Sequence, residues 1–284
     1  MADIARPSTN RVVFVRRDRC AVLTIDHPPV NGISLDVRTG LHEGLRSAIA
    51  DPGIEAIVVT GAAKQFSAGA DIRQFNTPAS NQWPLTRDLH ELIAQSSKPV
   101  VAAIHGYALG GALELALGCH FRVATPSARL GLPEVKLGLI PGGGGTQRLP
   151  RLIGVQAALD MIQSGDSIEG AAARKSGLID AVAQDDVLEA AAKYALSQAG
   201  TGTALPLAAR LPLLAEGFDF AARRDAVRPE VANLKAQQAA ITAVESGVHL
   251  PFDLAVMNER AIFDKLVVGP ESAALRHAFF ARKG

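Results

Sequence analysis

Two glutamates lie in the two most apolar, glycine-rich stretches of this chain: Glu114 within residues 106–118 and Glu134 within residues 130–141. Carboxylates are almost never fully buried without a partner, because the ionised group loses its hydration. Each acid is therefore either paired for structural reasons or kept in an apolar setting to move a proton. Both explanations stay open at this point.

A third segment, residues 66–71, could stabilise negative charge. The small residues at positions 68–70 leave main-chain N–H groups sterically open, and Gly69 permits backbone dihedrals that other residues resist. An amide exposed in such a loop can donate to an anionic oxygen. The alternative is a tight loop that only turns the chain.

The segment around Glu114 predicts a donor beside an acid. A strand expected over residues 100–104 leads into Gly110 and Gly111 and then into a helix. The Gly111 N–H would be one of the free donors at the helix N-terminus, and Glu114 would follow on the same face. A packing helix whose glutamate favours the N-terminal dipole is the alternative, but it does not explain the apolar neighbours.

The segment around Glu134 is less specific. Pro133 restricts the residue before it to extended geometry, so Glu134 is expected to begin a short turn, and an exposed turn acid is the alternative. Four glycines follow at positions 142–145. A Gly-Lys-Ser/Thr sequence is absent, which disfavours nucleotide phosphate binding and leaves loop closure over a ligand or close helix–strand packing.

Together these residues indicate one reaction type. Two backbone donors, Ala68 and Gly111, would stabilise an oxygen that becomes negative, and Glu114 and Glu134 would handle protons on adjacent carbons. Such a set suits enolate chemistry on an activated carbonyl such as a thioester. Losing one oxyanion donor typically costs about 3 kcal/mol of barrier.

The elements that must position these residues alternate between strand and helix. Strands are expected over residues 12–15, 21–25, 56–60 and 100–104, and helices over 35–50, 111–117, 155–164 and 187–197. This alternation predicts a layered α/β domain over residues 1–199. After the linker at 200–203 the pattern is helical and amphipathic, with helices expected over 233–244, 254–266 and 272–281, which predicts a helical C-terminal region over 200–284.

The composition excludes several classes of function. The chain has 284 residues, 48% of them hydrophobic, and a formal net charge of +1, so there is no global case for nucleic acid binding. Its two cysteines lack CxxC spacing and its histidines form no HExxH pair, so no metal site is expected. The polar N-terminus and the short apolar runs predict neither a signal peptide nor membrane insertion, and the cytoplasm is the expected compartment.

The same residues give the chain a family resemblance. Residues 66–72, Lys98-Pro99-Val100 with 106–111, and Leu132-Pro133-Glu134 through 141–142 to 147–149 form three ordered motifs with compatible spacing. With them the chain resembles the enoyl-CoA hydratase/isomerase (crotonase) superfamily over nearly its first 200 residues. The resemblance implies an α/β fold, a crotonase-like spiral of ββα units with a helical C-terminal region.

The resemblance also implies roles for individual residues. The oxyanion-hole positions fall on Ala68 and Gly111, and the paired catalytic acids fall on Glu114 and Glu134, which would hold one water. Glu114 would help remove its proton as it adds to C3, and Glu134 would protonate C2. Coenzyme A is part of the substrate, so no cofactor is implied, and Arg73 is a candidate for phosphate or adenine-side contact. The implied substrate contacts are Val30, Asn31, Ala68, Ala70, Asp71, Ile72, Gly110, Gly111, Pro133 and Gly142.

Residues 118–120, 131–134 and 278–283 look especially like the N-terminal hydratase/isomerase half of multifunctional β-oxidation enzymes. A standalone relative and a fragment of such an enzyme are both compatible with this likeness. The implied activity is hydration of 2-enoyl-CoA thioesters in fatty-acid β-oxidation. A Δ3–Δ2-enoyl-CoA isomerase at the same site and a non-catalytic acyl-CoA-binding subunit are the alternatives. A trimer, a hexamer or a monomer is compatible with the resemblance.

Overall fold

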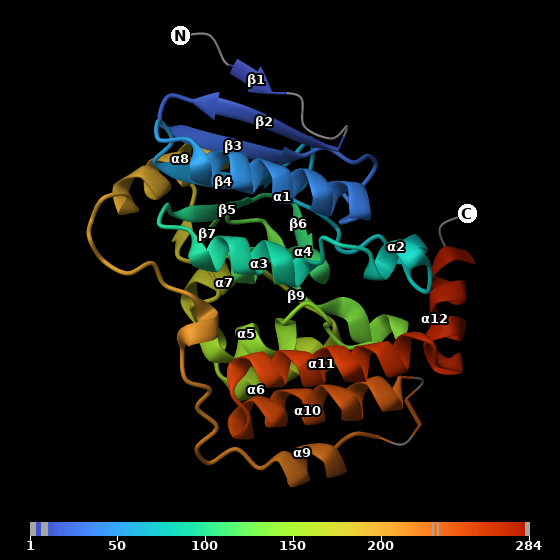
Figure 1. The fold of residues 1–284 in the computed structure, drawn as a ribbon. Helices are drawn as coiled ribbons and strands as arrows, with labels where there is room; N and C mark the ends of the chain where they lie inside the picture. The colour runs from blue at the N-terminus through green and yellow to red at the C-terminus, as the bar shows by residue number, and fades with distance from the viewer. Residues whose placement is uncertain (1–3, 7–10, 229, 232, 282–284) are drawn as a thin grey trace. The chain divides into compact units, whose positions relative to one another are not determined.

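The computed structural model describes residues 4–6, 11–228, 230–231 and 233–281 (Figure 1). Parts of the expectations for the N-terminus and for residues 278–283 therefore lie outside the described residues. The strands are β1 (Ile4–Arg6), β2 (Val12–Arg17), β3 (Cys20–Ile25), β4 (Ala56–Gly61), β5 (Val100–Ile104), β6 (Tyr107–Leu109), β7 (Phe121–Ala124), β8 (Arg129–Gly131), β9 (Ser167–Glu169) and β10 (Ala181–Val182). The helices are α1 (Leu35–Ala50), α2 (Pro78–Asn81), α3 (Thr86–Gln95), α4 (Gly111–Gly118), α5 (Gly145–Ile153), α6 (Val155–Ser164), α7 (Gly170–Ser176), α8 (Val187–Gln198), α9 (Phe220–Asp225), α10 (Leu234–His249), α11 (Phe252–Val267) and α12 (Pro270–Ala281), with short 3₁₀ turns η1 (Ile72–Gln74), η2 (Pro133–Leu137) and η3 (Ala208–Arg210).

The chain forms two compact units, Met1–Leu130 with Ile168–Leu207 and Gly131–Ser167 with Ala208–Gly284. The sequence predicted a contiguous core over residues 1–199 and a helical region over 200–284, so the structure divides the chain differently. The segment that carries Glu134 and the four glycines belongs to the same unit as the C-terminal helices.

The first unit is built on a seven-stranded sheet in the order β1-β2-β3-β4-β5-β7-β10. The strands from β3 to β10 are parallel, and Val22, Val58, Val101 and Phe121 are register partners across β3, β4, β5 and β7. Helix α8 packs against β4, β5 and β7, while α1 packs against β2 and β3. The uninterrupted burial of β4 and β5 follows from this parallel arrangement, as their sequences predicted.

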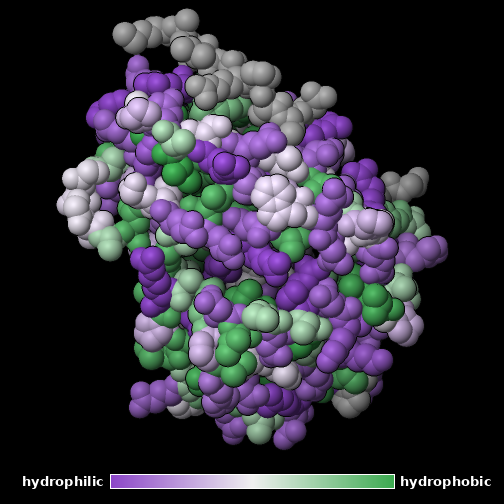
Figure 2. All heavy atoms as spheres, in the orientation of Figure 1, coloured by the Kyte–Doolittle hydropathy of each residue, from purple (hydrophilic) through white to green (hydrophobic). Residues whose placement is uncertain are grey.

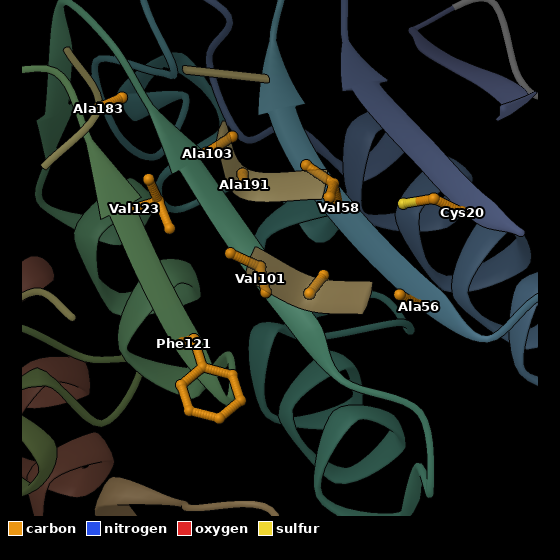
Figure 3. Close-up of a cluster of buried hydrophobic side chains, with 10 residues drawn as sticks. Cys20, Ala56, Val58, Val101, Ala103, Phe121, Val123, Ala183 and Ala191 are labelled. Atoms are coloured by element: carbon orange, nitrogen blue, oxygen red, sulfur yellow. The ribbon is translucent and has the colours of Figure 1, made fainter. Parts of the chain in front are cut away.

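The core between the sheet and α8 is made mostly of small and branched apolar side chains, with the ring of Phe121 among them (Figure 3). Each of β4, β5 and β7 contributes side chains two residues apart, because alternate side chains of a strand point to one face. Two alanines four residues apart on α8 complete the contact, which lets the helix approach the sheet closely. The buried cluster comprises Cys20, Ala56, Val58, Val101, Ala103, Phe121, Val123, Ala183, Ala191 and Ala195.

From β5 to β8, successive strands alternate between this sheet and a second, three-stranded sheet in the order β6-β8-β9. The chain passes from β5 in the first sheet to β6 in the second, through α4, and back to β7 in the first and β8 in the second. A parallel bridge between Ser67 and Ala108 brings the loop after β4 beside β6. The pattern is the spiral of ββα turns that the sequence predicted.

The second unit is helical. Helices α5, α6, α10 and α11 pack against one another, and α10 and α11 run side by side in Figure 1. The turn η2 packs against α6 and α12.

Among the described residues, none of the helices has the length and apolar character needed to cross a membrane. The face of the molecule drawn in Figure 2 mixes hydrophilic and hydrophobic side chains.

Candidate active site

The loop after β4 uses nearly all of its amides within the first unit. The N–H groups of Phe66 and Ser67 donate to the carbonyls of His105 and Tyr107 at 2.8 and 2.9 Å. The Gly69 N–H donates to Ser67 Oγ at 3.2 Å, and the Asp71 N–H donates to the Ile33 carbonyl at 3.2 Å. These bonds fix the loop between the segment after β3 and strand β6.

Ala68 does not offer an open amide. Its N–H donates to the carbonyl of Val30 at 3.0 Å, so the expectation that Ala68 is an oxyanion donor is wrong. The physical reason is that the segment ending at Ile33 runs beside the loop and supplies an acceptor that local sequence does not reveal. Ala68 is otherwise exposed, so contact between its remaining atoms and a substrate stays a prediction.

Ala70 has the free amide in this loop. Within the described residues, Ala70 is the one position from 66 to 71 whose N–H meets no acceptor. The Ile33–Ala70 parallel bridge explains this, because its hydrogen bonds use the Gly69 carbonyl and the Asp71 N–H and turn the Ala70 N–H to the opposite side. Gly69 enables the turn: its φ is +110°, and a Cβ there would lie 2.7 Å from the Leu109 carbonyl oxygen.

Gly111 lies directly beside Ala70. It is the first residue of α4, and its N–H has no acceptor among the described residues, as expected at a helix N-terminus. A Cβ on Gly111 would be 3.3 Å from Ala70 N and 3.4 Å from Ala70 Cβ, so the two residues adjoin without an intervening side chain. Both residues are partly exposed. Two unfilled main-chain donors therefore sit side by side at an accessible position.

Glu114 lies one turn further along α4 and is 5% exposed. Its main-chain oxygen is hydrogen bonded to Nε2 of His90, on α3, at 3.0 Å. His90 is itself buried, and its ring occupies the space left by the missing side chain of Gly118. The imidazole of His90 thus holds α4, the helix that carries Glu114, against α3. The sequence did not predict this role.

Val30 and Asn31 close the other side of the loop. The Asn31 side chain is buried, and its Nδ2 donates to the carbonyls of Ala62 and Gln65, each at 2.9 Å, while its Oδ1 accepts from the His27 N–H at 3.1 Å. Those side-chain bonds hold the loop together, so any contact of Asn31 with a ligand must use its main chain. Val30 is 40% exposed and available for side-chain contact.

Asp71 and Arg73 form a bidentate ion pair, with Nε–Oδ1 and Nη2–Oδ2 distances of 2.8 and 2.9 Å. Burial of Asp71 disfavours its ionised form, but the hydrogen bonds and the charge of Arg73 outweigh burial and lower the pKa of Asp71. Arg73 lies in η1, directly after the loop, and its side chain remains 66% exposed. Its predicted contact with phosphate or adenine stays a prediction.

The other predicted residues, Pro133, Glu134 and Gly142, belong to the second unit. Glu134 lies in η2, immediately after Pro133, which agrees with the short turn that was expected. It is partly buried, and its main-chain oxygen accepts from the Leu139 N–H at 3.1 Å. The turn ends at Gly138 in the left-handed region.

The four-glycine loop leads into α5, and a carboxylate of the chain accepts from two of the amides at this helix N-terminus. The Gly144 N–H donates to Glu259 Oε1 at 2.6 Å, and the Thr146 N–H donates to Glu259 Oε2 at 2.8 Å. A carboxylate of the chain itself therefore occupies the helix N-terminus where a phosphate would bind, which agrees with the prediction against a nucleotide loop. In the described part of the chain, no cluster of His, Cys, Asp and Glu could hold a metal ion.

Comparison with known proteins adds to this geometry. The sequence model of the family described as enoyl-CoA hydratase/isomerase matches residues 16–210. The chain belongs to the enoyl-CoA hydratase/isomerase family. Members of this family bind acyl-CoA thioesters.

Two relatives of the family are multifunctional proteins. The chain is 42% identical over 272 residues to the peroxisomal bifunctional enzyme of Homo sapiens, covering 93% of this chain and 37% of that protein. It is 38% identical over 285 residues to the glyoxysomal fatty acid beta-oxidation multifunctional protein MFP-a of Cucumis sativus, covering 96% of this chain and 39% of that protein. The chain thus spans less than two fifths of either relative.

The fold is also found in solved structures of the family. The enoyl-CoA hydratase/isomerase from Pseudoalteromonas atlantica T6c superposes with a TM-score of 0.71 at 23% identity, covering 96% of this chain and 98% of that chain. The predicted crotonase fold with a helical C-terminal region is confirmed.

Besides Ala68, three residues described here were missed or misassigned from sequence. Ala70 was taken as a substrate contact and not as the donor, although its position before Asp71 in the matched motif was visible. His90 and Glu259 carried no local signal, because both lie in ordinary amphipathic helical patterns. Their roles follow from tertiary packing.

Proposed function

We propose that this chain is a 2-enoyl-CoA hydratase that adds water across the 2,3 double bond in fatty-acid β-oxidation. The observation that carries the proposal is the pair of adjoining, unfilled amides of Ala70 and Gly111 at the start of the helix that bears the buried Glu114. Adjoining, unfilled amides suit an oxygen whose negative charge grows during the reaction.

The proposed mechanism divides the reaction between donors and acids. The amides of Ala70 and Gly111 bind the thioester oxygen. Glu114, as a carboxylate, accepts a proton from water as the water oxygen bonds to C3, and the π electrons move to the thioester oxygen. Glu134, as a carboxylic acid, gives its proton to C2 as the enolate collapses. The product has gained OH at C3 and H at C2, and the proton left on Glu114 is lost to solvent while Glu134 takes one up before the next turnover.

The remaining predicted contacts stay part of the proposal. Val30, the main chain of Asn31 and the 68–72 segment would follow the coenzyme A moiety. Gly110 and Pro133 would be further substrate contacts, and Gly142 would lie beside the water. The names of the multifunctional relatives support a place in fatty-acid β-oxidation. Those names refer to peroxisomes and glyoxysomes, and the cytoplasm stays a prediction for this chain.

The test is hydration of 2-butenoyl-CoA, followed by loss of the absorbance of the conjugated thioester. Wild-type protein should turn over, and Glu114→Gln and Glu134→Gln should each lower kcat by about 10²-fold or more. Activity that survives both substitutions contradicts the assignment. Turnover of a 3-enoyl-CoA alone would make the protein an isomerase, and binding of a saturated acyl-CoA without turnover of either substrate would make it a binding subunit.

A further inference from the structure

The second unit contains a fully buried carboxylate that the proposed reaction does not use. Glu259, on α11, has no exposed surface. Its Oε1 accepts from the Gly144 N–H at 2.6 Å, and its Oε2 accepts from the Thr146 N–H at 2.8 Å and from Thr146 Oγ1 at 2.5 Å. A buried charge is stable only with such dense hydrogen bonding, so the loop and the carboxylate depend on each other.

A second side chain of the same helix holds the beginning of the loop. Phe263 lies four residues after Glu259 and so faces the same side of α11. Its ring packs where a side chain at Gly142 would be, since a Cβ there would lie 2.8 Å from Phe263 Cγ and Cδ2. Helix α11 therefore fixes the loop at two points, with a ring against Gly142 and a carboxylate on Gly144 and Thr146.

The turn that carries Glu134 rests on the next helix in a similar way. A Cβ at Gly138, where η2 ends, would lie 3.1 Å from the main-chain N and Cα of Ser272 on α12. Consequently the two segments of this unit that the proposed function uses, η2 and the glycine loop, are both supported by the C-terminal helices.

We infer that Glu259 is a positioning residue for hydration, which holds the glycine loop so that Gly142 has one arrangement. This inference rests on the proposed function. Without the carboxylate, the donors of Gly144 and Thr146 would lose their acceptor, and the loop would rearrange to find another. Misplacement of reacting groups by about 1 Å can cost about 10²-fold in rate.

The experiment measures kcat and KM for 2-butenoyl-CoA hydration with the full chain. Glu259→Gln keeps the shape of the side chain but replaces one acceptor oxygen by a donor. It should lower kcat about 10- to 100-fold and change KM by less than about twofold, because the thioester oxygen is bound by amides of the first unit. Asp253→Asn, an exposed carboxylate on the same helix, is the matched control and should leave both constants unchanged.

A purely structural role would give a different result. If kcat falls only in proportion to the fraction of folded protein, counted by titrating binding sites with butanoyl-CoA, the inference is overturned. An unchanged kcat in folded Glu259→Gln overturns it as well. Should Glu259→Gln fail to fold, Thr146→Val decides, since it keeps the main-chain donors and removes the hydroxyl, which donates to Glu259 and accepts from Gln147 Nε2. A lower kcat at constant KM supports positioning, and an unchanged kcat overturns it.

The failure of the proposed function is recognisable separately. If the wild type does not hydrate 2-enoyl-CoA, that proposal fails whatever the variants do. Hydrogen exchange of the amides of residues 142–147 then tests the positioning role without any activity. Faster exchange in Glu259→Gln than in wild type and Asp253→Asn is expected, and equal exchange overturns the inference.

Discussion

Two helices of this chain begin after glycines, and their N-termini are used in opposite ways. Helix α4 begins at Gly111 after Gly110, and the Gly111 N–H has no acceptor among the described residues. Helix α5 begins at Gly145 after Gly144, and its N-terminal amides donate to the buried carboxylate of Glu259. The first N-terminus can receive an external negative charge, whereas the second is already neutralised by the chain.

The comparison shows that glycines before a helix do not by themselves make an anion site. The exposed amides and the helix dipole favour an anion at both places. Whether such a helix N-terminus stays open depends on whether another segment places a carboxylate there. At α5 this carboxylate is Glu259, which is 115 residues from Gly144 in the sequence. The open terminus is therefore the candidate for chemistry, and the filled one is a fixed support.

The largest expected effect is a loss of kcat that differs between substitutions of the two buried glutamates, Glu114 and Glu259. Glu114→Gln should lower kcat for hydration by about 10²- to 10⁴-fold, because it removes a general base from the open site. Its unfolding temperature should stay close to that of the wild type. Glu259→Gln should have the smaller kinetic effect and the larger thermal one, measured by calorimetry. The opposite ranking would reverse the roles assigned to the two helix N-termini.

The next effect tests which amide of the loop is the donor. Replacing Ala70 by the corresponding α-hydroxy acid changes its N–H into an ester oxygen and should lower kcat about 10²- to 10³-fold. The same replacement at Ala68 removes the hydrogen bond to Val30 and should cost about 1 kcal/mol of unfolding free energy with little change in kcat. A greater kinetic loss at Ala68 would restore the sequence-based assignment.

A third prediction concerns lateral support of α4. This helix is held by His90, whereas α5 is held at its N-terminus by Glu259. His90→Ala should lower the unfolding free energy by about 2–4 kcal/mol, because it leaves a cavity and removes the hydrogen bond to the Glu114 carbonyl. Denaturant unfolding measures it, with His277→Ala, an exposed histidine, expected to change stability by less than about 0.5 kcal/mol. Equal losses of unfolding free energy in His90→Ala and His277→Ala would contradict the supporting role of His90.

The smallest effect is a dependence of stability on pH at the open site. The pKa of Asp71 is lowered in the folded state, so its contribution is present above the unfolded pKa of about 3.9 and is lost as pH falls through the folded value. Because Arg73 is mostly exposed, this contribution should be below about 1 kcal/mol. The stability difference between wild type and Asp71→Asn should shrink between about pH 5 and pH 2; a difference that grows with acid contradicts it.

Much of the local structure was predictable from sequence. The helix expected over 155–164 is α6, and the helix expected over 35–50 is α1, whose N-cap Ser34 accepts a hydrogen bond from the Val37 N–H. The expected strands coincide with the cores of β2, β3, β4 and β5. Apolar periodicity, capping residues and strand-length apolar runs are local signals, and they survive in the folded protein because packing agrees with them.

The sequence by itself determined the elements, the family and the short list of residues that includes Glu114, Glu134 and Gly111. Only the tertiary structure decided which loop amide stays open, because Val30 and Ile33 use those of Ala68 and Asp71 and leave that of Ala70. It also turned Glu259, an ordinary charge in an amphipathic helix, into a buried anchor. Hydrogen-bond partners distant in sequence are set by how the segments pack, and no local pattern encodes them.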